Sequence, residues 1–163
     1  MKHTRKSIKR HAGTRKQIGN KVKMGGVPKR VNQEQFDMLI KKMLELLTSL
    51  KLYHWNTISY STHKATDDIH GQLSDKMDEY VEMMIGKSNR KYRINMSHFN
   101  HLMIKGVSNN TQMEMLIKSF INEIVSFHAQ LPQTFYSDVS NIKDEIVGSL
   151  NKFLYLLTLK QNL

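Results

Sequence analysis

Residues 62–86 read THKATDDIHGQLSDKMDEYVEMMIG, and this stretch decides the fold class expected for the chain. Its apolar residues recur every three or four positions, at Ile69, Leu73, Met77, Tyr80 and Met84. At about 100° per residue, these side chains fall on one narrow stripe of an α-helix. The stretch therefore predicts an amphipathic helix from about Thr62 to Ile85 that stops at Gly86.

Similar apolar periodicity predicts three more long helices. We expect them at about 32–53, 111–131 and 138–159, with Asn32 as an N-cap and a possible short helix at about 97–104. No convincing alternating strand pattern is present. Short links make the first and second helices antiparallel, and likewise the third and fourth, whereas a long crossover joins the second to the third. This all-α order is typical of a ferritin-like four-helix bundle.

The positive charge of the chain is concentrated at its N-terminus. The 163 residues carry a formal charge of +11, and residues 1–30 contain 11 Lys or Arg and no Asp or Glu. Residues 31–163 therefore hold the remaining 14 of the 25 basic residues, which match the 14 acidic residues there. Because few large apolar residues accompany this charge, we expect a disordered basic tail at residues 1–30 and one domain at residues 31–163.

Composition also restricts the compartment and the chemistry. The chain has no cysteine, which excludes disulfides and thiolate metal sites. No apolar run approaches the roughly 18–20 residues that span a bilayer, so we expect no membrane partner. A secretory signal is not indicated, because no apolar segment follows the basic N-terminus; an organellar transit peptide is a less favoured alternative. We expect a cytoplasmic or nucleoid-associated location, or a place in a virion.

A second stripe of the helix at 62–85 carries residues of the kind that bind metals. It contains His63, Asp67, Asp78 and Glu82, which lie within about 100° of one another around the helix axis. Asp67 and Asp78 are about 16 Å apart along that axis, so one helix cannot bring all four side chains to one ion.

Two copies of the helix can solve this problem. In an antiparallel pair about a two-fold axis, opposed residues have position numbers with a constant sum. That sum is 145 for His63 with Glu82 and for Asp67 with Asp78. Gly71 lies near the centre of the pairing, where a missing side chain permits close helix approach. The spacing predicts two identical sites shared between two chains.

The ligand types indicate which metal such a site prefers. Two carboxylates with imidazole suit iron or another mid-row divalent ion better than calcium or copper. The alternative is an ordinary solvated face, because His and Asp four residues apart are common on exposed helices.

The residues before this helix strengthen the metal interpretation through a family resemblance. Residues 52–56 read LYHWN, and the His-Trp-Asn triplet is followed by the spacing His-x3-Asp-x10-Asp-x3-Glu from His63 to Glu82. This combination resembles Dps, the DNA-binding protein from starved cells, a member of the ferritin-like superfamily. The resemblance covers residues 36–86 closely and the other helices by pattern. The Lys-, Ile- and Asn-rich composition is compatible with a version from a large DNA virus.

The resemblance implies a ferroxidase centre at a two-fold interface between chains. His54 of the triplet, His63 and Asp67 would come from one chain, and Asp78 and Glu82 from its partner. These five residues would be both the metal ligands and the catalytic residues, and would hold two Fe(II) ions per intersubunit site for oxidation by oxygen or peroxide. A homodimer is the smallest assembly implied, and the dodecameric shell of the family is the larger one.

His54 also has a purely structural interpretation. It continues the apolar stripe that Leu47 and Leu50 form on the first predicted helix, so it could be a hydrogen-bonded core histidine.

The basic tail predicts contact with a polyanion, most simply the phosphate backbone of DNA. Such binding is independent of base sequence, and the tail has no aromatic residue for base stacking. The candidate nucleic-acid residues are its eleven basic side chains: Lys2, Arg5, Lys6, Lys9, Arg10, Arg15, Lys16, Lys21, Lys23, Lys29 and Arg30. RNA binding, contact with an acidic protein, a solubility tail and a targeting signal are alternatives.

Two functions follow as hypotheses. The first is a Dps-like ferroxidase that binds DNA through its tail. The second is an architectural DNA-packaging or virion protein with the same fold and little or no ferroxidase activity. A ferritin-fold interaction module that has lost its site is a third.

Overall fold

A computed structural model describes residues 31–88 and 92–159 of the chain. Within these residues the chain forms four long α-helices and one short 3-10 helix, and no β-strand. The elements are α1 (Gln33–Asn56), α2 (Tyr60–Lys87), η1 (Met96–Phe99), α3 (Asn110–His128) and α4 (Ser137–Thr158). The predicted all-α class with four helices is confirmed, whereas the predicted tail at residues 1–30 lies outside the described residues.

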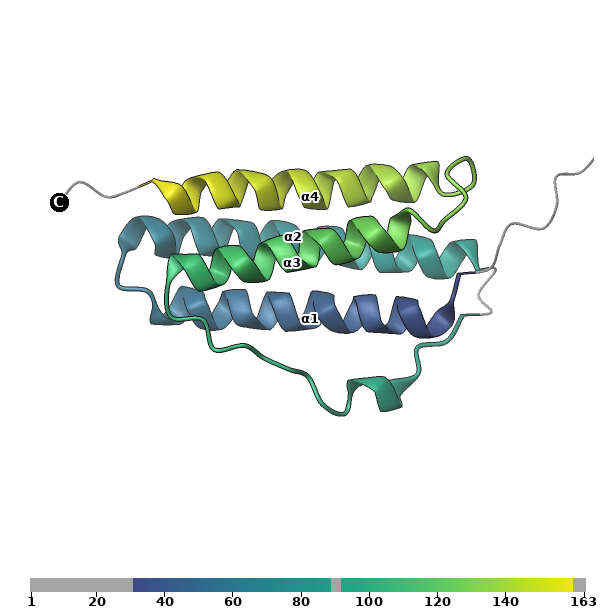
Figure 1. Ribbon diagram of the computed structural model, residues 1–163, viewed down its shortest axis with the longest axis horizontal. Helices are drawn as coiled ribbons and strands as arrows, with labels where there is room; N and C mark the ends of the chain where they lie inside the picture. The colour runs from purple at the N-terminus through teal and green to yellow at the C-terminus, as the bar shows by residue number, and fades with distance from the viewer. Residues whose placement is uncertain (1–30, 89–91, 160–163) are drawn as a thin grey trace, which may run out of the picture.

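The four long helices lie side by side along one axis (Figure 1). Short links make α1 antiparallel to α2 and α3 antiparallel to α4. The long connection from α2 to α3 returns along the length of the bundle beside α1, so α2 and α3 run parallel (Figure 1). α1 packs against α2 and α3, and α4 packs against the same two helices. None of these described helices combines the length and apolar character that a membrane span requires.

Side-chain caps mark where α1, α2 and α3 begin, whereas α4 has no side-chain cap. The Asn32 side chain accepts a hydrogen bond from the Gln35 backbone N–H at 3.3 Å, so the predicted N-cap is confirmed. Ser59 caps α2 and Asn109 caps α3 in the same way. Each cap satisfies a backbone donor that the helix itself cannot, which typically contributes about 1 kcal/mol.

The predicted apolar stripes form the core. On α2, all five apolar stripe residues named from the sequence are buried, and Leu73 and Tyr80 are fully inaccessible. The corresponding stripes of α1, α3 and α4 complete one hydrophobic cluster. The period of 3.6 residues therefore located most of the interior. On α3 the expected stripe was partly wrong, because it included Met115, which is exposed, and left out Met113 and Ile117, which are fully buried.

The core also contains a polar pair. The rings of Tyr80 and His128 have centroids 5.7 Å apart, and both side chains are buried. Among the described residues, neither the Tyr80 hydroxyl nor either His128 ring nitrogen has a hydrogen-bond partner. Burial, with a smaller contribution from the positive charge of Lys143, lowers the pKa of His128 to about 4. The bundle therefore encloses a neutral imidazole.

Two buried carboxylates of α1 hold the crossover in place. Asp37 is fully buried, accepts a hydrogen bond from the Tyr92 hydroxyl and lies 3.1 Å from Nδ1 of His98. Two turns later, Glu45 accepts a hydrogen bond from the Met103 backbone N–H at 2.8 Å. These contacts join segments about 55 to 61 residues apart in the sequence and attach the crossover to the outer side of the bundle.

Several boundaries differ from the sequence prediction. α2 continues through the predicted stop at Gly86 to Lys87. α1 continues three residues past Tyr53, which places His54 within its last turn. The helix expected at about 97–104 is only the turn Met96–Phe99, because Glu45 takes the N–H of Met103 that a longer helix would have used. α3 ends at His128 rather than at about 131, since Pro132 disfavours helical geometry in the residue before it.

Candidate metal centre

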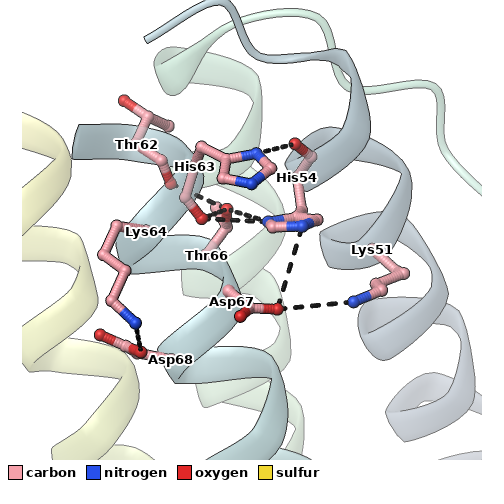
Figure 2. Close-up of polar contacts among 8 residues, drawn as sticks. All are labelled: Lys51, His54, Thr62, His63, Lys64, Thr66, Asp67 and Asp68. Carbon is pink, nitrogen blue, oxygen red and sulfur yellow. Dashed lines mark hydrogen bonds and ion pairs between the residues drawn. The ribbon is translucent and has the colours of Figure 1, made fainter. Parts of the chain in front are cut away.

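The tight turn between α1 and α2 brings two histidines together. Only residues 57–59 separate the two helices, so the last turn of α1 lies beside the first turn of α2. The His54 and His63 rings stack there with centroids 3.9 Å apart and planes inclined by 27° (Figure 2). His54 is buried, whereas His63 is exposed in the single chain.

The two rings are fixed by reciprocal hydrogen bonds. Nδ1 of His54 lies 3.0 Å from the backbone oxygen of His63, and Nδ1 of His63 lies 3.0 Å from the backbone oxygen of His54 (Figure 2). A carbonyl oxygen only accepts, so each Nδ1 carries the proton and donates. In a neutral imidazole this leaves the lone pair on Nε2, which is the arrangement that a carbonyl hydrogen-bonded to the other ring nitrogen imposes on a metal-binding histidine.

Thr66 supports the same arrangement from within α2. Its hydroxyl donates to backbone oxygens of the preceding turn, those of Thr62 and His63. The hydroxyl oxygen can therefore accept from Nδ1 of His54, which lies 3.2 Å away. Thr66 is fully buried, so this contact lies in the packed seam between the helices.

Asp67 lies beside the buried His54 ring. Its Oδ1 lies 3.9 Å from Nε2 of His54, the ring nitrogen that the hydrogen bonds leave as an acceptor. About half of the Asp67 side chain is exposed, so the carboxylate can bind something from outside the chain. The structure therefore brings together His54, His63 and Asp67, although they come from two helices.

Lys51 is a neighbour that the sequence reasoning missed. Its Nζ lies 3.6 Å from the same Asp67 oxygen and 5.9 Å from the centre of the Trp55 ring. Lys51 precedes His54 by three positions, so helical spacing alone places both on one side of α1. That spacing was the available signal. The positive charge of Lys51 also lowers the pKa of His70, after the larger effect of burial.

Asp78 and Glu82 lie elsewhere on the same helix. Both are exposed, as are His63 and Asp67, while the apolar stripe of α2 is buried. The two predicted faces of α2 are therefore confirmed. Within the described residues of one chain, however, no group of three or more His, Asp or Glu side chains converges tightly enough to hold a metal ion. One chain supplies two separated halves of the predicted ligand set.

Comparison with known proteins places this chain in a family. A family model described as a family of unknown function (DUF5856) matches residues 54–157. The chain belongs to this family. The match begins at His54, so the DUF5856 region contains all five candidate ligands, while the eleven basic candidates at residues 1–30 lie outside both the match and the described residues.

One curated relative of this DUF5856 protein comes from a virus. It is an uncharacterized 14.6 kDa protein from the mobD-ri intergenic region of Enterobacteria phage T4. The two chains are 29% identical over 121 residues, which cover 72% of this chain and 86% of the phage protein. No solved structure matches the chain.

Proposed function

We propose that this protein is a Dps-like ferroxidase that oxidises Fe(II) at a site shared between two chains. The observation that carries the proposal is the reciprocal His54–His63 pair. It directs Nε2 of His54 toward Asp67 and holds the proton of both rings on Nδ1. His54 is buried and hydrogen-bonded, as its structural interpretation also expects. What favours a ligand pair is that metal-binding histidines have their other ring nitrogen held by a carbonyl in this way, here in both rings.

The exposed stripe of α2 supports a shared site. Asp78 and Glu82 follow Asp67 by three to four helical turns on the same exposed face, about 16–22 Å along the axis. An antiparallel partner helix would bring its Asp78 opposite Asp67 and its Glu82 opposite His63. The up-down order with one long crossover also supports the ferritin-like assignment.

The ligand set suits the proposed substrate. Carboxylate and imidazole donors accept both Fe(II) and Fe(III), and carboxylates favour the ferric product. Two Fe(II) ions supply two electrons, which with two protons reduce one molecule of peroxide to two of water. The protein contributes ligand geometry and two imidazoles whose Nδ1 protons are held by backbone carbonyls, so Nε2 is the nitrogen that each ring offers to the metal.

The eleven basic residues of the tail give the second part of the proposal. An oligomer carrying many such tails would bind DNA phosphates with an avidity that one tail lacks. The protein would then oxidise iron beside the DNA it covers. The phage relative makes a role with viral DNA, in the infected cell or in the virion, the natural setting.

Paired single substitutions test the shared site. We expect Asp67→Ala and Glu82→Ala each to abolish rapid Fe(II) oxidation, followed by absorbance of the ferric product. Asp68→Ala and Glu79→Ala are the matched controls, because both acids lie on α2 but pair with Lys64 and Lys76 away from the stripe. Unchanged oxidation in Asp67→Ala would end the ferroxidase assignment.

Mixing the two inactive variants separates a shared site from a site within one chain. In a two-fold dimer of Asp67→Ala with Glu82→Ala, one site loses both residues and the other keeps all of its ligands. Random co-refolding therefore restores about a quarter of the wild-type sites. No recovery from the mixture, with dimers present, would contradict the two-fold arrangement.

One observation favours the architectural alternative. Lys51 already forms an ion pair with Asp67 within the chain. The negative charge of Asp67 can therefore be neutralised without a metal. A protein that shifts DNA in a gel but shows no Fe(II) binding under anaerobic titration would support packaging as the function.

A further inference from the structure

An apolar groove lies between the beginning of α1 and the end of α3. It has a volume of about 460 Å³, and its apolar wall includes Met38 and Leu39 of α1 and Phe127 of α3. Glu34 and Glu123 stand on its two sides. The groove is on the α1–α3 side of the bundle, away from the α2 stripe that carries the candidate ligands.

The charge around the groove is negative. Among the described residues, neither Glu34 nor Glu123 has an ion-pair partner. The basic residue beside them, Lys42, is paired with Glu45 at 3.0 Å. An occupant that combines apolar side chains with positive charge would complement both the wall and the two carboxylates, of which Glu123 accepts a hydrogen bond from the Ser119 hydroxyl.

We propose that this groove binds the chain's own residues 21–28. They read KVKMGGVP, with apolar Val22, Met24 and Val27, two lysines, and no acid. The apolar side chains would cover the groove at Met38, the exposed residue of its apolar wall, and the lysines would face Glu34 and Glu123. The proposal does not depend on the iron chemistry or on binding to nucleic acid.

The chain connectivity places this segment within reach. The described chain begins at Val31, which is partly buried against the core two residues before α1. The groove is lined by Glu34 and Met38 from the first turns of that helix. Met24 precedes Val31 by seven positions, which allows about 23 Å of extended chain. The groove runs beside residues 34–42 of α1, a rise of about 12 Å. Gly25 and Gly26 permit the reversal that folds the segment back along the helix.

Docking in the same chain has an advantage over capture of a second molecule. A segment tethered by a few residues experiences an effective concentration in the millimolar range, so weak apolar and ionic contacts suffice. The bound state would hold Lys21 and Lys23 against the bundle and keep them from other polyanions. The groove would thus compete with other polyanions for the lysines of the basic tail.

The absence of cysteine from the sequence makes a disulfide test direct. We would introduce Met24→Cys with Ser126→Cys, because Ser126 is an exposed residue of the groove. The matched control pairs Met24→Cys with Asn141→Cys, an exposed residue near the start of α4. Equal mixtures of isotope-labelled and unlabelled full-length chains, oxidised gently and mapped by mass spectrometry, distinguish bonds within a chain from bonds between chains.

We expect the Ser126 pair to close within one chain at least about tenfold faster than the Asn141 pair. Adding Glu123→Lys should slow that closure, whereas Glu114→Lys, on the same helix outside the groove, should not. Equal rates for the two pairs would overturn the proposal, since the tail would then show no preference for the groove. Bonds that join labelled to unlabelled chains would also overturn it, in favour of occupation by a second copy.

Discussion

The Lys51 ammonium and the Asp67 carboxylate form an ion pair of 3.6 Å across the seam between α1 and α2. The same carboxylate oxygen is 3.9 Å from the His54 imidazole. The Lys51 ammonium therefore occupies the Asp67 carboxylate, which the proposed site would use as a metal ligand. The two cations compete for one carboxylate, and this competition sets the first prediction.

Replacing Lys51 with Met should strengthen metal binding. A partly exposed ion pair contributes up to about 1 kcal/mol, so its removal should raise Fe(II) affinity about two- to fivefold. Anaerobic titration measures this change. Lys64→Met is the control, because Lys64 forms a comparable exposed pair with Asp68. Weaker binding in Lys51→Met would show instead that Lys51 holds Asp67 in place for the metal.

The reciprocal hydrogen bonds predict a defined tautomer for each histidine of the stacked pair. At pH 8, where imidazole is neutral, His54 and His63 should both carry the proton on Nδ1. Long-range ¹H–¹⁵N NMR of the imidazole rings reads this directly, and the exposed His101 serves as an unconstrained reference. Protonation on Nε2 of either ring would remove the lone pair on which the metal proposal depends.

His128 predicts a loss of stability in mild acid. Its folded pKa of about 4 lies below the unfolded value of 6.5, so the unfolded chain takes up the proton first as the pH falls. The stabilisation is complete above pH 6.5 and declines as the pH falls toward 4, by about 3 kcal/mol at most. Urea unfolding at pH 7.5 and 4.5 measures it.

A matched pair of variants isolates that histidine. His128→Leu should flatten most of this pH dependence, and because it also removes two unpartnered polar atoms from the core it should not greatly weaken the fold at pH 7.5. His101→Leu, at an exposed position, should leave the pH profile unchanged. A wild-type profile retained in His128→Leu would assign the acid sensitivity to another group.

The buried Asp37 predicts a specific weakness in the crossover. Asp37→Ala leaves the Tyr92 hydroxyl and the His98 ring without their shared partner, which should cost about 2–4 kcal/mol of unfolding free energy. Tyr92→Phe should cost less, because it leaves the contact with His98. Hydrogen exchange should speed up in residues 92–107 before it does in α3. Asp75→Ala, an exposed acid on α2, is the control; equal effects of the two substitutions would contradict the assigned role of Asp37.

The tail predicts salt-dependent DNA binding. For full-length protein, the logarithm of the association constant should fall linearly with the logarithm of salt concentration, with a slope of about −0.9 per phosphate contacted. Replacing Arg5, Lys6, Lys9 and Arg10 with Gln should make the slope shallower by up to about 3.6. Binding should be equal for unrelated duplexes of one length. An unchanged slope would place the DNA contact outside this part of the chain.

Several features of the fold could be predicted from local sequence pattern. The 3.6-residue apolar repeat located all four long helices and most of their buried stripes. Asn32 was identified as a cap from its residue type and from Gln35 three positions later. The separation of the α2 ligand stripe from its apolar stripe was also visible, because both follow from residue spacing on one helix.

The contacts between separate helices and the crossover could not be predicted from residue spacing. The reciprocal His54–His63 bonds depend on the three-residue link that sets one helix turn beside another. The burial of Asp37 depends on a crossover that begins more than fifty residues later. Neither contact could be predicted from local periodicity, because each joins residues of two different elements.

The sequence by itself thus determined which residues face inward and which faces remain polar, because backbone periodicity converts residue order directly into helix faces. Only the tertiary structure decided which nitrogen of each histidine is free, that Lys51 competes for Asp67, and that an acidic apolar groove opens beside the start of α1. Those properties depend on distances of a few ångströms between separate segments, which packing and turn geometry set and residue order alone does not.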